Sequence, residues 1–156
     1  MTHGPLQNKP QFDRVMAMLE DAKTTASVAG QGNIPSGSGY FVPATILRDI
    51  ADSHPVVTEE QFGPVLPVLP FDDVEDAINR ANATIYGLAA SVFSADVNKA
   101  RVIAARVEAG TVTVNKTIAF HENIPFGGAK SSGLGIDNGQ QAFAAYGQLH
   151  ILDISS

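Results

Sequence analysis

The middle of the chain alternates between apolar runs of strand length and stretches whose apolar residues recur at helical spacing. Val65–Phe71 precedes a helical stretch that begins at Asp72, and Gly87–Phe93 precedes another that begins near Ser94. The β-branched run Thr111–Asn115 follows and is typical of a buried strand. Strands that alternate with helices form a parallel or mixed sheet with helices on its faces. The sequence therefore predicts an α/β fold in a three-layer-like arrangement.

The helices also have recognisable faces and ends. The second one shows capping-box spacing between Asp72 and Glu75. We expect Ser94 to cap the third helix and Gly110 to end it. The first helix is expected from about Pro10 to Lys23, and its buried face combines Phe12, Val15, Met16, Leu19 and Ala22.

Four further segments complete the predicted elements. Ala26–Ala29 and Tyr40–Leu47 are expected to be strands on either side of a loop over 30–39 that is rich in Gly, Pro and Ser. Near the end of the chain, we expect a short helix over Gln140–Tyr146 and a last strand over Leu149–Ile154.

Composition excludes several classes of protein. The 156 residues are 44% apolar and 17% charged, which is typical of a globular domain and not of a disordered one. The net charge of -6 disfavours nucleic-acid binding, because phosphate contacts need a cationic face. No apolar stretch approaches the roughly 18 residues of a membrane helix, and Met1–Lys9 lacks the apolar core of a secretory signal. We expect a soluble, cytoplasmic protein.

Several short motifs, in this order along the chain, resemble the closing part of an NAD(P)-dependent aldehyde dehydrogenase. Each motif alone is a weak signal, but their shared order and separation make the resemblance strong. It spans nearly the whole chain and covers the family's final third. The motifs are Gly4-Pro5-Leu6, Gly39-Tyr40-Phe41, the block Glu59–Val65, Arg80-Ala81-Asn82 with Tyr86-Gly87-Leu88, the run Ala109–Asn115, and the block Pro125–Gly135.

The resemblance implies a truncated catalytic domain over residues 1–146 and an oligomerisation strand over residues 147–156. In this family a cysteine thiolate attacks the aldehyde carbonyl, hydride passes to NAD(P)+, and a glutamate-activated water releases the carboxylic acid. The present chain contains no cysteine. By resemblance, that nucleophile, the glutamate base and the dinucleotide-binding domain precede the region that this chain matches. Gly30–Pro35 begins like a dinucleotide fingerprint, but Pro35 replaces its third glycine.

Four residues are expected at the cofactor. By resemblance, the Glu60 carboxylate accepts hydrogen bonds from the nicotinamide ribose hydroxyls, a role that suits an ionised acceptor. Phe62 is expected against the nicotinamide end, and Gln11 and Arg14 near the adenosine ribose. The alternatives are a plain surface carboxylate before a Gly-Pro turn for Glu60, and solvated helix side chains for Gln11 and Arg14.

Three apolar residues are expected to bind substrate. In relatives, the loop that holds Ile118, Phe120 and Phe126 lines the aldehyde tunnel, and an aromatic wall suits an apolar aldehyde tail. The alternative is core packing beneath a long loop; for Phe126 both apply. In the same block, Lys130 and Ser132 are expected to hold the loop together.

Other candidate sites have simpler explanations. The glycines of the Pro125–Gly135 block lack the Lys-Ser/Thr of a phosphate loop. The four histidines offer no metal pair at helical spacing, and His121 beside Glu122 is a poor acid/base couple, since sequence neighbours on a loop need not face each other. The acidic cluster at the start of the second helix is better explained by capping than by metal binding.

Two functions follow from these observations. The first is part of an aldehyde dehydrogenase that uses NAD or NADP; the chain alone is expected to be inactive and to bind no cofactor. The second is a non-catalytic fragment that self-associates through exposed sheet edges. Expected partners are a small-molecule aldehyde in the intact enzyme and either further copies of the chain or a complementary N-terminal chain. Nucleic acid, membranes and metals are not expected.

Overall fold

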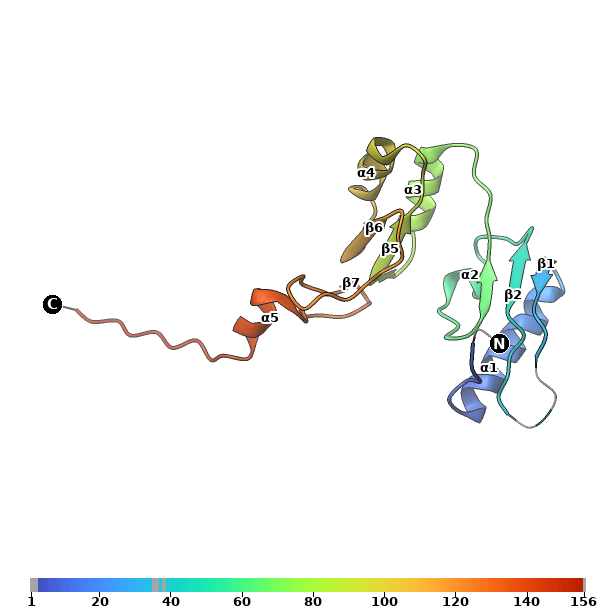
Figure 1. Ribbon diagram of the computed structural model, residues 1–156, viewed down its shortest axis with the longest axis horizontal. Coiled ribbons are helices and arrows are strands. Elements are labelled where there is room, and N and C mark those ends of the chain that lie inside the picture. Colours follow the sequence, from blue (N-terminus) through green and yellow to red (C-terminus); the bar gives the residue numbers. More distant parts are fainter. Residues whose placement is uncertain (1–2, 35–36, 38, 156) are drawn as a thin grey trace. The chain divides into compact units, whose positions relative to one another are not determined.

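The computed structural model describes residues 3–34, 37 and 39–155. Within it the chain divides into two compact units, Met1–Phe71 and Asp72–Ser156. The boundary coincides with the start of the stretch for which the second helix is predicted. Each unit has its own helices and its own small sheets (Figure 1).

The first unit combines two helices with a three-stranded sheet. Helix α1 (Lys9–Lys23) starts where the Asn8 side chain accepts the N–H of Gln11. The short helix α2 (Pro55–Thr58) lies between the second and third strands in sequence. The sheet has the order β1 (Ser27–Gln31), β2 (Thr45–Arg48) and β3 (Val65–Pro67), with β2 antiparallel to β1 and parallel to β3.

One apolar core holds these elements together. Strand β2 shows why: Thr45 and Leu47 are buried while Ile46 is 43% exposed, since successive side chains of a strand point to opposite faces. Buried residues of α1 pack in the same cluster as Leu47, which consists of Val15, Leu19, Ala22, Val42, Leu47, Val56 and Val65. Helix α1 is therefore anchored in the core, and its remaining side chains project from a fixed backbone.

The second unit contains three helices and two two-stranded sheets. Parallel strands β5 (Ala89–Val92) and β6 (Thr111–Val114) are joined through helix α4 (Val97–Ala104), which is the strand–helix–strand connection that the sequence predicts. The remaining elements are α3 (Val74–Asn82), the antiparallel pair β4 (Tyr86–Gly87) and β7 (Ala129–Lys130), and α5 (Gly139–Ala145).

The mixed α/β class is confirmed. The expected single sheet with helices on its faces is not observed, because the strands of the described residues form three small sheets. The strand expected over Tyr40–Leu47 is shorter, because β2 begins only at Thr45, after Pro43. The predicted caps are also displaced. Asp73 caps α3 instead of Asp72, and Asp96 caps α4 instead of Ser94.

One further prediction is wrong, and another is not confirmed. Helix α4 ends at Ala104 with Ala105 as its C-cap, so Gly110 does not terminate it. No strand is found over residues 149–155, which run out from α5 as an extended and exposed segment (Figure 1). A strand requires a hydrogen-bonded neighbour, and none of the described segments supplies one here. In the region of Gly30–Pro35, Gly30 belongs to β1 and Pro35 lies outside the described residues.

Candidate functional site

A tight loop joins α2 to β3 and carries the first two predicted cofactor residues. We call residues 59–63 the 59–63 loop. It starts as Glu59 caps α2, with its N–H bonded to the Pro55 carbonyl at 2.8 Å. The Gln61 side chain donates back to the Val56 carbonyl, and Phe62 has a φ of +51°, in the left-handed region. The loop therefore has a defined backbone conformation that hydrogen bonds to α2 stabilise.

Helix α1 contacts the backbone of this loop through the other two predicted cofactor residues. Gln11 Nε2 donates to the carbonyl oxygens of Gln61 at 2.6 Å and Phe62 at 3.2 Å. The Arg14 guanidinium donates to the carbonyl of Glu60 at 2.9 Å and to that of Gln61 at 3.3 Å. The four residues predicted from the resemblance thus come together in the first unit.

Two additional contacts complete the attachment of the loop to α1. Arg14 also pairs with the Glu59 carboxylate at 3.3 Å. A Cβ atom added to Gly63 would lie only 2.7 Å from Cγ1 of the fully buried Val15. A side chain at position 63 would therefore force Val15 or the loop to shift.

The side chains of Glu60 and Phe62 are turned to solvent. Phe62 is 73% exposed, and Glu60 is exposed. Among the residues that the structure describes, the Glu60 carboxylate has no hydrogen-bond or ion-pair partner. An unpaired carboxylate can accept hydrogen bonds from a diol, and an exposed aromatic ring two residues further along the same loop can cover a flat ring of a ligand.

The predicted substrate residues lie in the second unit, after β6. The rings of Phe120 and Phe126 meet edge to face with their centroids 4.8 Å apart. Phe126 is half-buried and exchanges two backbone hydrogen bonds of 2.7 Å with Asp137. Phe120 remains 69% exposed, and Ile118 is half-buried. The structure therefore brings two of the three together as an aromatic pair.

The loop of Phe126 is fixed by close backbone packing. A Cβ added to Gly110 would lie 1.7 Å from the Gly127 carbonyl oxygen, so the two backbone segments touch directly. Ser132 Oγ accepts the N–H of Gly87 at 2.9 Å. Lys130 Nζ donates to the Asn82 carbonyl at 2.7 Å and also bonds Glu108. These contacts agree with the expectation that Lys130 and Ser132 hold the block together.

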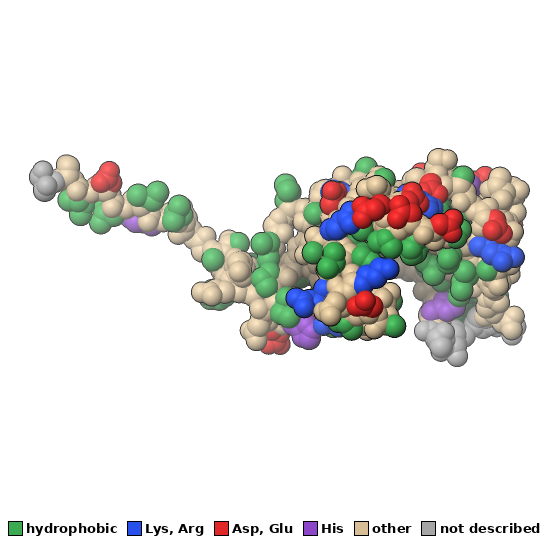
Figure 2. All heavy atoms as spheres, turned by 90° about the horizontal axis from the view of Figure 1, so that it is seen from above, with side chains coloured by type: hydrophobic (Ala, Val, Ile, Leu, Met, Phe, Trp, Pro, Cys, Tyr) green, Lys and Arg blue, Asp and Glu red, His purple; other side chains and the backbone are tan. Residues whose placement is uncertain are grey.

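The acidic cluster at the start of α3 is structural. Asp73 accepts the Glu75 N–H at 3.2 Å as the helix cap. The Arg106 guanidinium clasps the Glu75 carboxylate with two bonds of 2.6 and 2.5 Å, and these bonds lower the pKa of Glu75 and raise that of Arg106. Figure 2 shows acidic and basic side chains interleaved on the face in view, with no continuous basic patch.

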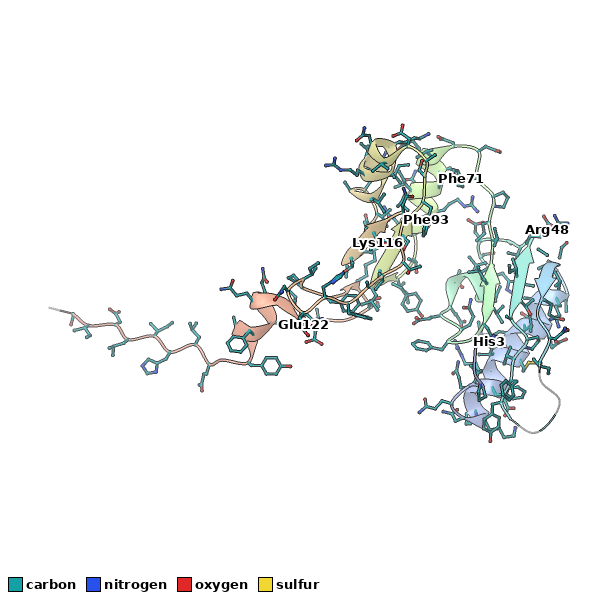
Figure 3. The ribbon with its side chains drawn as sticks, viewed as in Figure 1. His3, Arg48, Phe71, Phe93, Lys116 and Glu122 are labelled. Atoms are coloured by element: carbon teal, nitrogen blue, oxygen red, sulfur yellow. The ribbon has the colours of Figure 1, made fainter. Side chains whose placement is uncertain are left out.

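No group of three potential metal ligands occurs within the described part of the chain. Glu122 lies beside the start of α5 (Figure 3), where its carbonyl accepts the N–H of Gly139 at 2.8 Å. Nothing in the structure pairs its side chain with that of His121. Searching the described residues, we find no helix with the length and apolar character that crossing a bilayer requires.

One contact near the 59–63 loop escapes sequence analysis. His54 Nδ1 accepts the N–H of Val56 at 3.2 Å and so caps α2, while its Nε2 lies 3.4 Å from the Asp21 carboxylate on α1. The available signal was Pro55, because proline favours the first position of a helix and marks the preceding residue as a cap.

Known proteins match the chain along almost its entire length. The model of the aldehyde dehydrogenase family matches residues 1–152. Betaine aldehyde dehydrogenase from Rhizobium etli is 41% identical over 150 residues, and retinaldehyde dehydrogenase 3 from Mus musculus is 39% identical over 152 residues. These matches cover 94% and 97% of the chain but only 31% and 30% of the relatives, so the chain spans about a third of their length.

Solved structures agree with the sequence matches. A variant of an aldehyde dehydrogenase from Bacillus cereus has a TM-score of 0.87 at 41% identity, over 94% of the chain and 30% of that protein. An aldehyde dehydrogenase from Mycobacterium tuberculosis, solved with NAD+, has a TM-score of 0.85 at 37% identity, over 93% of the chain and 30% of that protein. The family model, the relatives and the structures agree, and the chain belongs to the aldehyde dehydrogenase family.

Proposed function

We propose that this chain supplies the nicotinamide-ribose anchor and part of the aldehyde-binding wall of an NAD(P)-dependent aldehyde dehydrogenase. The observation that carries the proposal is the state of the 59–63 loop. Its backbone carbonyls are engaged by Gln11 and Arg14, whereas the Glu60 carboxylate has no partner among the described residues. A carboxylate kept available in this way is an acceptor for ligand hydroxyls.

In this proposal Glu60 and Phe62 bind and orient the cofactor. The ionised Glu60 accepts hydrogen bonds from the two ribose hydroxyls, and charge-assisted bonds of this kind are stronger than neutral ones. The exposed ring of Phe62 covers the nicotinamide end and limits its movement. When bound, NAD(P)+ supplies the hydride acceptor. Gln11 and Arg14 belong to the same site.

Ile118, Phe120 and Phe126 form the proposed substrate wall. The edge-to-face pair of Phe120 and Phe126 presents an apolar, uncharged surface. Such a surface suits the uncharged tail of an aldehyde, because small-molecule sites are lined mostly by apolar and aromatic side chains.

The isolated 156-residue chain is proposed to be inactive. It contains no cysteine to form the thiohemiacetal. Two charge-assisted hydrogen bonds accepted by Glu60, each worth about 1.5–3 kcal/mol, do not offset the roughly 4–15 kcal/mol that association costs in lost translational and rotational freedom. Cofactor binding therefore needs the additional parts that the longer relatives possess.

A hybrid enzyme tests this proposal. Residues 1–152 replace the matching segment of the Rhizobium etli betaine aldehyde dehydrogenase, and NAD+ reduction is followed in the presence of betaine aldehyde. We expect the hybrid to reduce NAD+ and the isolated chain not to do so. A hybrid that folds, as judged by its melting temperature, and still fails to turn over would contradict the proposal, as would activity of the isolated chain.

A second candidate function is self-association without chemistry. It is favoured by the extended segment after α5, whose apolar side chains are 75–84% exposed: Leu149, Ile151, Leu152 and Ile154. An exposed extended segment with apolar side chains is a template for pairing with another copy. Light scattering of the full chain at tens of micromolar (roughly the range of weak association) is expected to show oligomers that Ile151→Asp dissociates. Monomers alone at that concentration would exclude this function.

A further inference from the structure

The backbone at Phe62 adopts a conformation that is unfavourable for its residue type. Its φ of +51° lies in the left-handed region, where residues other than glycine, Asn and Asp are rare. The neighbouring Gly63 does not have a positive φ, so the left-handed conformation falls on Phe62 and not on the glycine beside it. Such conformations persist only where surrounding contacts impose them.

The surrounding contacts come from one face of α1. Gln11 and Arg14 are three residues apart and therefore neighbours on the helix surface. Between them they donate to three consecutive loop carbonyls, those of Glu60, Gln61 and Phe62, at 2.6–3.3 Å. One residue further on, Val15 packs against Gly63. The helix thus makes ordered contacts with successive residues of the loop.

From this geometry we infer that Gln11 and Arg14 are positioning residues: they hold Phe62 in its left-handed conformation and so present Glu60 and Phe62 to the cofactor. This inference rests on the proposed function and assigns the two residues a role through the loop backbone. Their support is firm, because α1 is anchored by Val15, Leu19 and Ala22, all fully buried.

A further hydrogen bond, from the Gln61 side chain, accompanies a difference in exposure along the loop. Gln61 is half-buried and donates to the Val56 carbonyl on α2, whereas Glu60 and Phe62 on either side of it are exposed. Held in this way, the backbone that carries the two exposed groups is fixed before any ligand arrives. Preorganised groups bind more tightly than mobile ones because the ordering cost is met in advance. Release of the loop would weaken cofactor binding although Glu60 and Phe62 remain.

The test uses the full chain in solution, without cofactor. The backbone conformation of Phe62 is read by NMR from its 13Cα and 13Cβ shifts and from residual dipolar couplings. The test variant combines Gln11→Met with Arg14→Met, which preserves side-chain length and helix propensity but removes the donors. Lys9→Met is the matched control, because Lys9 is a basic residue of α1 that pairs only with Asp13 among the described residues. Asp49, with a φ of +58° in the same unit, is the internal reference.

We expect the left-handed signature of Phe62 in the parent chain and in Lys9→Met, and its loss in the double variant, with Asp49 unchanged throughout. Arg14→Lys combined with native Gln11 should retain the signature, since an ammonium still donates to a carbonyl. If the double variant unfolds, each single methionine variant is measured instead, and the Phe62 resonances should broaden or shift in both. Retention of the left-handed signature in the folded methionine variants would overturn the inference. Because no cofactor is present, this outcome is separate from failure of the proposed function, which Glu60→Gln tests without altering a loop contact.

Discussion

Gly63 lies against Val15 so closely that a Cβ atom at position 63 would come within 2.7 Å of Val15 Cγ1 and 2.9 Å of Cγ2. Val15 is fully buried in the core cluster, so its side chain has little space to move. The contact couples the 59–63 loop to the core of the first unit. The position of this loop is therefore set by the packing of the core of the first unit.

Gly63→Ala should destabilise the chain by about 1–3 kcal/mol, because the added methyl group overpacks the core. Gly30→Ala is the matched control, since a Cβ there meets no atom within 4 Å, and it should change stability by less than about 1 kcal/mol. Urea unfolding measures both midpoints. Equal midpoints for the two variants would show that the contact is not as close as described.

Gly110→Ala should lower the free energy of unfolding by about 3 kcal/mol, at the upper end of the range expected for Gly63→Ala. The clash is with the Gly127 backbone, so no side-chain rotation relieves it. The substitution should also separate the rings of Phe120 and Phe126, since the loop that carries Phe126 must shift. Gly4→Ala, at an open position, is the control. Unfolding midpoints and ring-to-ring nuclear Overhauser effects measure the two results, and an unchanged ring contact would argue against this account of the loop.

The pair between Glu75 and Arg106 should make stability depend on pH. Hydrogen bonds from Arg106 lower the pKa of Glu75, so the folded state favours the charged carboxylate. The resulting stabilisation is complete above the ordinary glutamate pKa of about 4.3 and is lost as the pH falls through the lower folded value. The melting temperature of the parent should exceed that of Glu75→Gln at pH 7, and the gap should close at acid pH.

Salt provides the control for that prediction, because an exposed ion pair is screened. The gap at pH 7 should narrow as sodium chloride is raised. The same comparison with Asp76→Gln, which removes the Asp76–Arg80 pair on one helix, should show a smaller gap. A gap for Glu75→Gln that is constant from pH 7 to pH 3 would refute the assignment.

His54→Ala should remove the cap of α2 and cost about 1 kcal/mol. His54→Asn should restore most of this stability, because Asn is a favoured N-cap residue that offers an acceptor to the same N–H. His150→Ala is the control, since His150 lies in the exposed segment after α5. Urea midpoints of the three variants test the cap, and equal losses for Ala and Asn at position 54 would count against it.

The local elements could be predicted from the sequence where one pattern of residues dominated. Helix α1 was expected almost at its observed bounds, because apolar spacing and a proline mark it. The short helix α5 was also expected within one residue of its observed bounds. The caps of α3 and α4 were misplaced by one or two residues. In both places several cap-forming residues are adjacent, such as Asp72 and Asp73, and only the local backbone selects one.

The resemblance proposed Glu60, Phe62, Gln11 and Arg14 as site residues, and their roles toward the cofactor stay predictions. Nothing in the sequence indicated that Gln11 and Arg14 bind loop carbonyls some 46–51 residues away. Such contacts depend on how α1 packs on the sheet, and the conformation of Phe62 follows from them. The last strand was predicted from a pattern that needs a partner, so its pairing stays a prediction.

The most direct test of the central claim is the Michaelis constant for NAD+ of the hybrid enzyme carrying Glu60→Gln. The neutral amide loses the charge that strengthens the hydrogen bonds to the ribose, so we expect this constant to rise by about tenfold or more. Glu20→Gln, which neutralises another exposed carboxylate of the first unit, should leave it unchanged. Equal constants for NAD+ in the parent hybrid and in Glu60→Gln would contradict the claim that Glu60 anchors the cofactor.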